Sequence, residues 1–246
     1  MAEADQAPPS SILDGAALFL DFDGTLVELA DTPGSIRVGA ELRPLLDRLS
    51  RRLEGRLAII SGRGIADLER HLDCSGIAVS GSHGLELRLA SGESIPLAAA
   101  GELREAREEV RCFAAGVAGL LVEEKPASVA VHFRKAPAEE ERVTRFMLDL
   151  AGRSGLTVQH GKLVAELRPW GADKGDAVRA FMSQPEFEGT TPVFIGDDLT
   201  DEHAFEAARD LGGGGVLVGP PRATAARWRL ADVAAVSAWL NEGARG

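Results

Sequence analysis

Residues 16–26 read AALFLDFDGTL, an apolar run that ends in two aspartates and a glycine. A short run of this kind is typical of a buried strand in a parallel sheet. Residues 56–61 (RLAIIS) and 191–196 (TPVFIG) have the same form. Apolar side chains at helical spacing over residues 40–53 and 65–72 predict helices after the first two strands. This alternation predicts an α/β fold with a doubly wound, Rossmann-like parallel-sheet core.

The rest of the predicted core continues this alternation. After a strand at 77–80, leucines at every second position before Ser91 and Gly92 predict a hairpin. Further on we expect helices at 174–182, 201–209 and 231–240 and a strand at 216–218. Glycines fill positions 212–215 without forming a G-x-G-x-x-G motif, and we expect a flexible turn there.

The middle of the chain follows a different pattern, in which a helix is followed by two strands, twice. The predicted ranges are 102–117, 120–124 and 129–134, and then 139–150, 156–159 and 163–167. Two such units predict an antiparallel sheet with helices on one face, inserted in the core as an α+β cap.

These patterns predict the domain organisation. We expect a core domain over residues 12–98 and 170–246, with a cap domain over residues 99–169. Residues 1–11 offer no periodic apolar face that would offset the entropy of ordering them, so we expect a flexible tail there.

The composition narrows the class of protein. The 246 residues are 45% hydrophobic, enough for a buried core, and their net charge of −11 would repel nucleic acid and anionic membranes. No apolar run approaches the ~20 residues that cross a bilayer, and the acidic, Pro-rich start does not resemble a signal peptide. Cys74 and Cys112 lack metal-type spacing, which favours a reducing compartment. We therefore expect a cytoplasmic protein that binds neither nucleic acid nor membranes. A monomer is our expectation, although no residue pattern determines the oligomeric state.

Two carboxylates stand where the first strand ends. Asp21 and Asp23 can face the same side because side chains alternate along a strand, and Gly24 lets the backbone turn around a bound group. Crowded carboxylates separate their pKa values, which suits a nucleophile beside a general acid/base. The alternative is that Asp-Gly forms only a turn.

A second acidic group, GDDLTDE at residues 196–202, follows another apolar strand. Carboxylates gathered there would repel one another unless a cation lay among them, and oxygen ligands favour Mg²⁺. An acidic first turn of the following helix explains Glu202 and part of Asp201. It does not explain Asp197 and Asp198 at a strand end.

Phosphate could be held by Ser61, Gly62 and Arg63 at the end of the second strand and by Lys174 at the start of a helix. A hydroxyl, free backbone N–H groups and an ammonium suit three phosphate oxygens. Taken singly, Ser61 is equally explained as a helix cap and Lys174 as a solvated charge.

Four elements follow one another along the chain, which are DFDGT, Ser61, Lys174 and GDDLTD. In these elements and their order, the sequence resembles the haloacid-dehalogenase-type phosphatases over most of its length. The resemblance implies that Asp21 is the nucleophile and that Asp23 protonates the leaving oxygen and then activates water. Ser61 and Lys174 would hold the phosphate.

The same resemblance implies a Mg²⁺ cofactor. Its implied ligands are Asp21, the backbone carbonyl of Asp23, and Asp197, with Asp198 and Asp201 in support.

Segments in the middle of the chain narrow the resemblance. GSHGLE, Glu123-Glu124-Lys125, HFR at 132–134 and GKLVAELRP are similar to the trehalose-6-phosphate phosphatase family, whose cap has two helix-strand-strand units. This implies a sugar-phosphate substrate and the last step of trehalose biosynthesis. The implied substrate contacts are Thr25, Arg63, Glu123, Lys125, His132, Arg134, Lys162 and Glu166. Without the resemblance, alternating polar residues on two strands would indicate an ordinary solvated sheet face.

Other classes of protein fit less well. Position 80 is Ser, so Ser82 does not lie in the G-x-S-x-G elbow of a hydrolase, and Gly161-Lys162 lacks P-loop spacing. The five histidines form no H-E-x-x-H zinc motif. Two alternatives stay open, which are a phosphatase for another glycoside phosphate (sucrose-phosphate or a glucosylglycerol-type phosphate) and an inactive sugar-phosphate binding module.

Overall fold

The computed structural model describes residues 6–30, 35–95, 100–125, 128–161, 163–169 and 173–245. The chain divides into two compact units. The first unit combines Met1–Ile95 with Ala172–Gly246, and the second is the intervening segment Pro96–Gly171. The predicted domain limits and the role of the second unit as a cap stay predictions.

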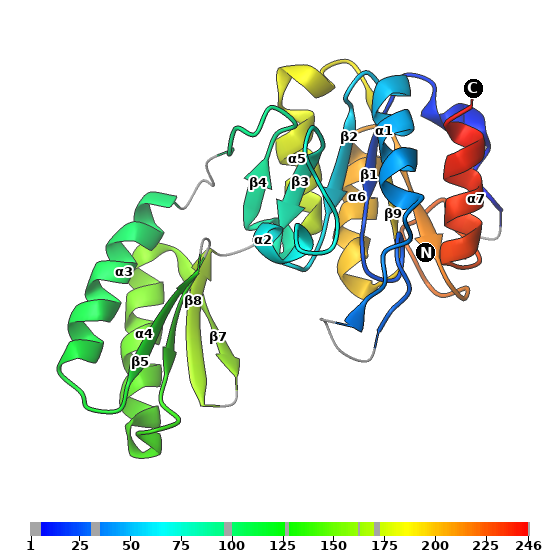
Figure 1. Cartoon of the computed structure of the whole chain (residues 1–246). Helices are drawn as coiled ribbons and strands as arrows, with labels where there is room; N and C mark the ends of the chain where they lie inside the picture. Colours follow the sequence, from blue (N-terminus) through cyan, green and yellow to red (C-terminus); the bar gives the residue numbers. More distant parts are fainter. Residues whose placement is uncertain are drawn as a thin grey trace. The chain divides into compact units, whose positions relative to one another are not determined.

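The first unit is built on a seven-stranded sheet in the order β11-β10-β9-β1-β2-β3-β4. Its strands are β1 (Ala16–Leu20), β2 (Leu57–Ile60), β3 (Ala78–Gly81), β4 (Glu86–Arg88), β9 (Thr191–Gly196), β10 (Gly214–Val218) and β11 (Trp228–Leu230). All neighbours are parallel except β3 and β4. Because β1 lies between β2 and β9, the segments that follow these three strands leave the same edge of the sheet (Figure 1).

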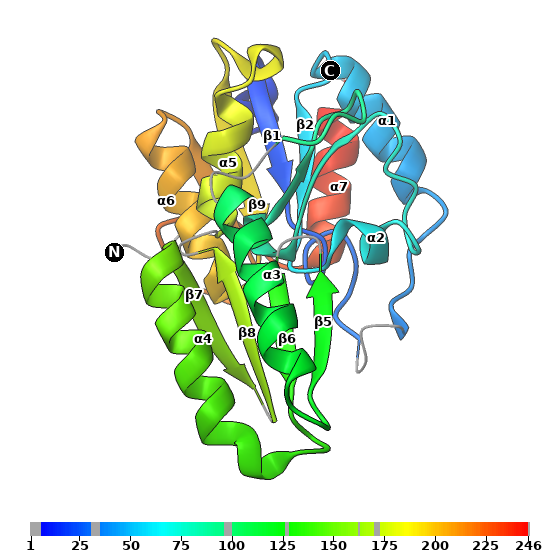
Figure 2. The same cartoon turned by 90° about the vertical axis from the view of Figure 1, so that its left-hand side faces the viewer.

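Helices cover both faces of this sheet (Figures 1 and 2). They are α1 (Leu42–Arg52), α2 (Ile65–Leu68), α5 (Lys174–Met182), α6 (Glu202–Asp210) and α7 (Val233–Gly243). Side chains of β1 alternate between the faces, because Leu18 and Leu20 join the apolar cluster with α1 and α7, whereas Phe19 stacks on Phe181 of α5. The predicted doubly wound α/β core is confirmed.

Short 3-10 turns connect several elements. They are η1 (Ser10–Leu13), η3 (Ser82–Gly84), η4 (Pro137–Glu139), η5 (Pro185–Phe187) and η6 (Leu199–Asp201). Within the described ranges, no helix has the length and apolarity that crossing a membrane requires.

The second unit has a four-stranded antiparallel sheet in the order β5-β6-β8-β7. Its elements are α3 (Ala100–Ala115), β5 (Leu121–Lys125), β6 (Ser128–His132), α4 (Glu140–Ser154), β7 (Leu156–Gly161) and β8 (Val164–Pro169). Figure 2 shows α3 and α4 side by side across one face of this sheet. Val129, Val131 and Leu167 pack beneath the helices, so the side chains that alternate with them form the opposite, helix-free face.

The glycine run at 212–215 differs from the expected flexible turn. Gly214 and Gly215 begin strand β10 and are buried. A Cβ on Gly215 would lie 2.3 Å from the Phe205 ring, so packing against α6 requires a glycine there. Strand β11, which the sequence analysis missed, pairs with β10 at Trp228–Leu230.

The described part of the expected tail makes contacts with the core domain. The carbonyl of Pro8 accepts a hydrogen bond from Trp239 Nε1 (2.8 Å), and the carbonyl of Gln6 accepts one from the N–H of Arg229 (2.9 Å). After β3, the expected hairpin is present, because the N–H of Leu89 donates to the carbonyl of Glu93 (2.8 Å), the N–H of Ile95 donates to that of Leu87 (2.9 Å), and Arg88 forms an antiparallel bridge with Ser94. Strand β4 also pairs with β3.

Candidate active site

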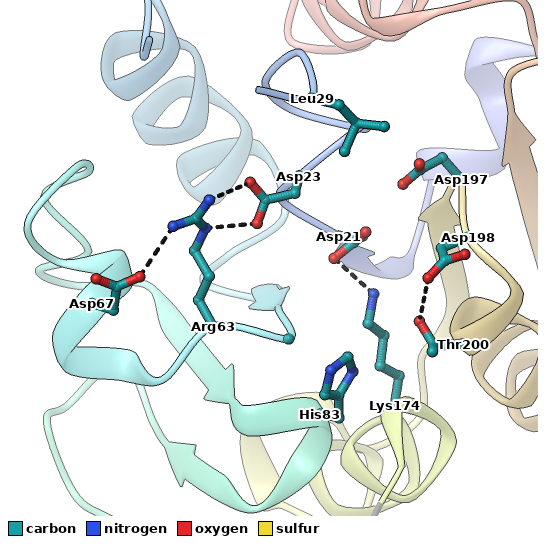
Figure 3. A pocket seen from close by; sticks show the side chains of 11 residues that line it. Asp21, Asp23, Leu29, Arg63, Asp67, His83, Lys174, Asp197, Asp198 and Thr200 are labelled. Atoms are coloured by element: carbon teal, nitrogen blue, oxygen red, sulfur yellow. Dashed lines mark hydrogen bonds and ion pairs between the residues drawn. The ribbon is translucent and has the colours of Figure 1, made fainter. Parts of the chain in front are cut away.

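A cavity of about 630 Å³ opens in the first unit where β1, β2 and β9 end. Parallel sheets place their ligands at this edge. The cavity is lined by Asp21, Asp23, Leu29, Gly62, Arg63, Asp67, His83, Lys174, Asp197, Asp198 and Thr200 (Figure 3). The side chains come from segments more than a hundred residues apart, and the parallel order of the strands brings them together.

Lys174 joins two buried carboxylates. Its Nζ lies 2.8 Å from Asp21 Oδ1 and 2.6 Å from Asp201 Oδ1, and no side chain of the three is more than 5% exposed. Burial opposes the ammonium, but the charges of the two aspartates raise the pKa of Lys174 above its usual value. Burial, and then the charge of Asp201, raises the pKa of Asp21 well above its usual range. The single positive charge of Lys174 therefore does not fully compensate the negative charges of Asp21 and Asp201.

A third carboxylate completes a candidate cation site. Ligand atoms of Asp21, Asp197 and Asp201 lie within 4.8 Å of one another, the one such group found in the described part of the chain. Burial, followed by the charge of Asp201, also raises the pKa of Asp197. Oxygen-only donors with uncompensated negative charge fit a hard divalent cation such as Mg²⁺. Both oxygens of Asp201 accept hydrogen bonds, Oδ1 from Lys174 and Oδ2 from the N–H of Asp198 (2.9 Å), whereas Lys174 contacts Asp21 through Oδ1.

Gly24 brings the DFDGT segment against Asp197. Its φ is +77°, and a Cβ there would lie 2.2 Å from Asp197 Oδ2, so no larger residue fits this approach. The neighbouring Thr25 is fully buried, and its hydroxyl donates to Asp197 Oδ1 (3.4 Å). Thr25 thus supports a candidate cation ligand, and its expected contact with substrate stays a prediction.

Asp198 lines the cavity but lies outside the three-carboxylate group, and its expected role in support of the metal stays a prediction. Its Oδ1 accepts from the N–H of Leu199 (2.7 Å) and its Oδ2 from the Thr200 hydroxyl (3.4 Å). Asp198 therefore caps the turn η6 that leads to Asp201, which is the capping role that short polar side chains take at helix starts.

Arg63 holds Asp23 by a fork of two hydrogen bonds (Figure 3). Its Nε donates to Asp23 Oδ2 (2.6 Å) and its Nη2 to Oδ1 (2.8 Å), while Nη1 donates to Asp67 (3.0 Å). A bidentate pair fixes the plane of the carboxylate. The Asp23 side chain is thus turned toward Arg63 and lies outside the three-carboxylate group, and the expected role of its backbone carbonyl at a cation stays a prediction.

Ser61 is fully buried, and its Oγ accepts from the N–H of Arg63 (3.1 Å). The cavity wall at this point is formed by Gly62 and Arg63, and Ser61 is not part of it. The hydroxyl thus shapes the loop after β2, and its predicted contact with phosphate stays a prediction.

His83 is a cavity residue that the sequence analysis missed. Ser82 and His83 have φ values of 52° and 58°, a left-handed conformation that is rare outside glycine and that clusters at functional sites. Their N–H groups donate to the carbonyls of Arg63 (2.7 Å) and Ser61 (3.0 Å), which ties this turn to the loop after β2. The only sequence signal was the GSHG segment, whose backbone conformation cannot be read from composition.

The predicted sugar-contacting residues gather on the helix-free face of the second unit. Glu123 and Glu166 both lie opposite Ala130 of β6 in the sheet register. Lys125 Nζ lies 3.1 Å from both oxygens of Glu166, and His132 Nε2 lies 2.7 Å from Glu123 Oε2.

Two further predicted contacts complete this group. Arg134 follows β6, and with His132, Leu121 and Lys135 it lines a second cavity of about 590 Å³. Lys162 falls outside the described residues. The structure thus brings five of the six predicted residues of this unit to one region.

Comparison with known proteins adds independent information. Residues 19–234 match the family model described as trehalose-phosphatase. The probable trehalose-phosphate phosphatase of Sinorhizobium fredii is 41% identical over 214 residues, 86% of this chain and 81% of that protein. The trehalose-6-phosphate phosphatase of Escherichia coli is 37% identical over 236 residues, 92% of this chain and 85% of that protein. A solved structure of Aspergillus fumigatus trehalose-6-phosphate phosphatase aligns with a TM-score of 0.65 at 27% identity and covers 98% of each chain.

Proposed function

Because this chain belongs to the trehalose-phosphatase family and is therefore a phosphoric monoester hydrolase, we propose that it converts trehalose 6-phosphate to trehalose and inorganic phosphate, with Mg²⁺ and through an aspartyl-phosphate at Asp21. The observation that carries the mechanism is the placement of Asp21, Lys174 and Asp197 in one cavity at the edge of a parallel sheet. The choice of trehalose 6-phosphate as the substrate rests on the relatives that are named for it.

In the first step an oxygen of Asp21 attacks phosphorus, and the bond between phosphorus and the sugar oxygen breaks. Lys174 orients this carboxylate through its contact with Oδ1, and its ammonium can attract the oxygens of the phosphate. Asp23 gives its proton to the departing sugar oxygen, which leaves as the hydroxyl of trehalose.

In the second step Asp23, now ionised, takes a proton from water. The resulting hydroxide attacks the phosphorus, inorganic phosphate leaves, and the Asp21 carboxylate is restored. Arg63 and Asp23 line the same cavity, and release of the two hydrogen bonds from Arg63 would free the Asp23 carboxyl for both proton transfers.

The donor set described above fits Mg²⁺, which would be held by Asp21, Asp197 and the backbone carbonyl of Asp23. When bound, the cation supplies the positive charge that lets a phosphate dianion approach clustered carboxylates. Lys174 alone cannot supply this charge, because it is shared between Asp21 and Asp201.

The polar face of the second unit would bind the sugar. Glu123 and Glu166 offer acceptors and Lys125 offers donors to sugar hydroxyls. These residues fit a disaccharide better than a small phosphate ester, which presents few hydroxyl groups. A phosphatase for sucrose-phosphate or a glucosylglycerol-type phosphate is the less favoured alternative, because the relatives described above are named for trehalose phosphate.

Phosphate release from a panel of sugar phosphates tests this proposal. We expect trehalose 6-phosphate to give the highest kcat/KM, and we expect turnover to vanish in excess chelator and return with added Mg²⁺. A higher kcat/KM for another glycoside phosphate would overturn the substrate, and full turnover in chelator would overturn the role of Mg²⁺.

A further inference from the structure

Glu202, which the sequence analysis assigned only to the acidic first turn of a helix, has a second role in the structure. Its carboxylate accepts from the Thr224 hydroxyl (2.9 and 3.1 Å) and from the N–H of Ala225 (2.7 Å), and it forms an ion pair with Arg222. Four acceptor contacts are far more than a helix dipole requires. They join the start of α6 to the connection between β10 and β11.

Arg222 extends this contact to the acidic loop. Its Nη2 donates to the carbonyl of Asp198 (2.9 Å) and more weakly to the carbonyl of Asp197 (3.4 Å). These two carbonyls belong to the loop that follows β9 and carries the candidate cation ligands. The guanidinium therefore holds this loop by its backbone, while its Nη1 is fixed by Glu202.

The loop needs such support because its side chains repel one another. Asp197 and Asp201 place carboxylate oxygens within 4.8 Å of each other and of Asp21. Like charges at this distance favour an opened loop until a cation arrives. Lys174 holds Asp201, and Gly24 and Thr25 lie against the side chain of Asp197. The backbone of Asp198 is bonded within the loop to Asp201, and Arg222 adds a contact to it from outside the loop.

We propose that Arg222, fixed by Glu202, is a positioning residue for the cation site: it presets the loop from Asp197 to Asp201 so that the carboxylates stand ready to bind Mg²⁺. This inference rests on the cation site of the proposed function. Arg222 does not line the cavity, so it acts through the loop and not through contact with substrate.

The test is direct measurement of Mg²⁺ binding to the metal-free protein by calorimetry. For Arg222→Gln we expect the Kd for Mg²⁺ to rise by about 10- to 100-fold, the range that supporting contacts contribute at metal sites. The rise in melting temperature on adding Mg²⁺ should shrink in parallel. At saturating Mg²⁺, kcat should approach that of the wild type, because the catalytic groups are unchanged.

Arg209→Gln is the matched control. Arg209 lies on α6, is exposed, and among the described residues pairs with the neighbouring Asp210 alone. The Mg²⁺ affinity of Arg209→Gln should therefore equal that of the wild type. If Arg222→Gln does not fold, Arg222→Lys decides the question, because Lys keeps the charge but lacks the guanidinium fork and should still raise the Kd.

An unchanged Kd in a folded Arg222 variant would overturn the inference and leave the proposed function intact. So would a loss of kcat that saturating Mg²⁺ does not restore. If the wild-type protein binds no Mg²⁺, the cation site of the proposed function fails, and the inference fails with it.

Discussion

The ion pairs that Lys174 forms with Asp21 and Asp201 in the first unit differ chiefly in burial from the Lys125–Glu166 pair of the second-unit sheet. The side chains of Lys174, Asp21 and Asp201 are 3%, 5% and 0% exposed. In the second unit, Lys125 is 42% exposed and Glu166 is 23% exposed. Both sets form ion pairs at about 3 Å, so distance alone does not distinguish them.

Burial changes what each pair can do. A buried ion whose partner is removed has no water to replace that partner, so the first set acts as one unit. Exposed pairs contribute about 0–1 kcal/mol, so water or a sugar hydroxyl can replace either partner with little loss. The buried arrangement suits a catalytic site whose groups must keep one geometry around phosphorus. The exposed arrangement suits a binding surface, where a ligand can replace the ion pairs that form in its absence.

The largest expected effect is that of Asp21→Asn. The amide has nearly the same shape but is a poor nucleophile, so we expect kcat to fall by about 10⁴-fold or more with the fold retained. Phosphate release and circular dichroism measure both. Turnover near the wild-type value would show that Asp21 is not the nucleophile.

Asp23→Asn should reduce kcat by about 10²- to 10⁴-fold, the usual contribution of a general acid/base. With an aryl phosphate, whose leaving group needs no proton, attack by Asp21 should continue while hydrolysis of the aspartyl-phosphate stalls. We therefore expect a rapid burst of about one aryl alcohol per chain, followed by slow turnover. A linear time course at the wild-type rate would remove the assigned role.

Lys174→Met compared with Lys125→Met tests the contrast in burial through stability. Loss of Lys174 leaves Asp21 and Asp201 buried without their ammonium, and we expect the free energy of unfolding to fall by about 3–5 kcal/mol. Loss of the exposed Lys125 should lower it by no more than about 1 kcal/mol. Urea unfolding measures both, and equal losses would contradict the contrast. Adding Asp201→Asn to Lys174→Met should recover part of the loss.

The same contrast explains how much the sequence could predict. Strand β1 and the DFDGT segment were predictable from one stretch of sequence. The strand is buried and therefore apolar, and the residues that follow it line the cavity, so the same pattern indicates both the fold and the site. The pairing of Lys174 with Asp201 was not predicted, since residue types and order do not specify which partner an ammonium reaches.

Backbone geometry accounts for other misses. The left-handed turn at Ser82 and His83 is held by carbonyls of the loop after β2, a contact between segments that no local pattern encodes. Gly215 was assigned to a turn because glycine is common there, whereas it is required by the Phe205 ring against the strand. Glu202 was explained by its position at a helix start, and nothing in the sequence indicated its ion pair with Arg222.

In the second unit, Glu166→Ala and Lys125→Ala should each lower kcat/KM for trehalose 6-phosphate by about 10²-fold, since charged hydrogen bonds are lost and a partner is left unpaired. Hydrolysis of a small aryl phosphate should change little. Glu141→Ala is the control, because Glu141 lies on α4 and, within the described part of the chain, pairs with Arg145 alone. Equal losses on both substrates would indicate a structural role, and no loss on either would remove these residues from the sugar site.

The smallest expected effect concerns Glu123, and it differs in sign from that of the buried Asp21. The hydrogen bond from His132 lowers the pKa of Glu123 below its ordinary value of 4.5. Ionised Glu123 therefore contributes stability above pH 4.5 that is lost as the pH falls through the lowered pKa. Because this side chain is half exposed, Glu123→Gln should lower the free energy of unfolding at pH 7 by less than about 1 kcal/mol.

The pKa of Asp21 is instead raised, first by burial, so the contribution of Asp21 to wild-type stability falls as the pH rises toward that raised value. Relative to wild type, Glu123→Gln should become less stable with rising pH and Asp21→Asn more stable. Urea unfolding of both variants across the acid range measures these slopes, and slopes of the same sign would show that burial does not separate the two regions.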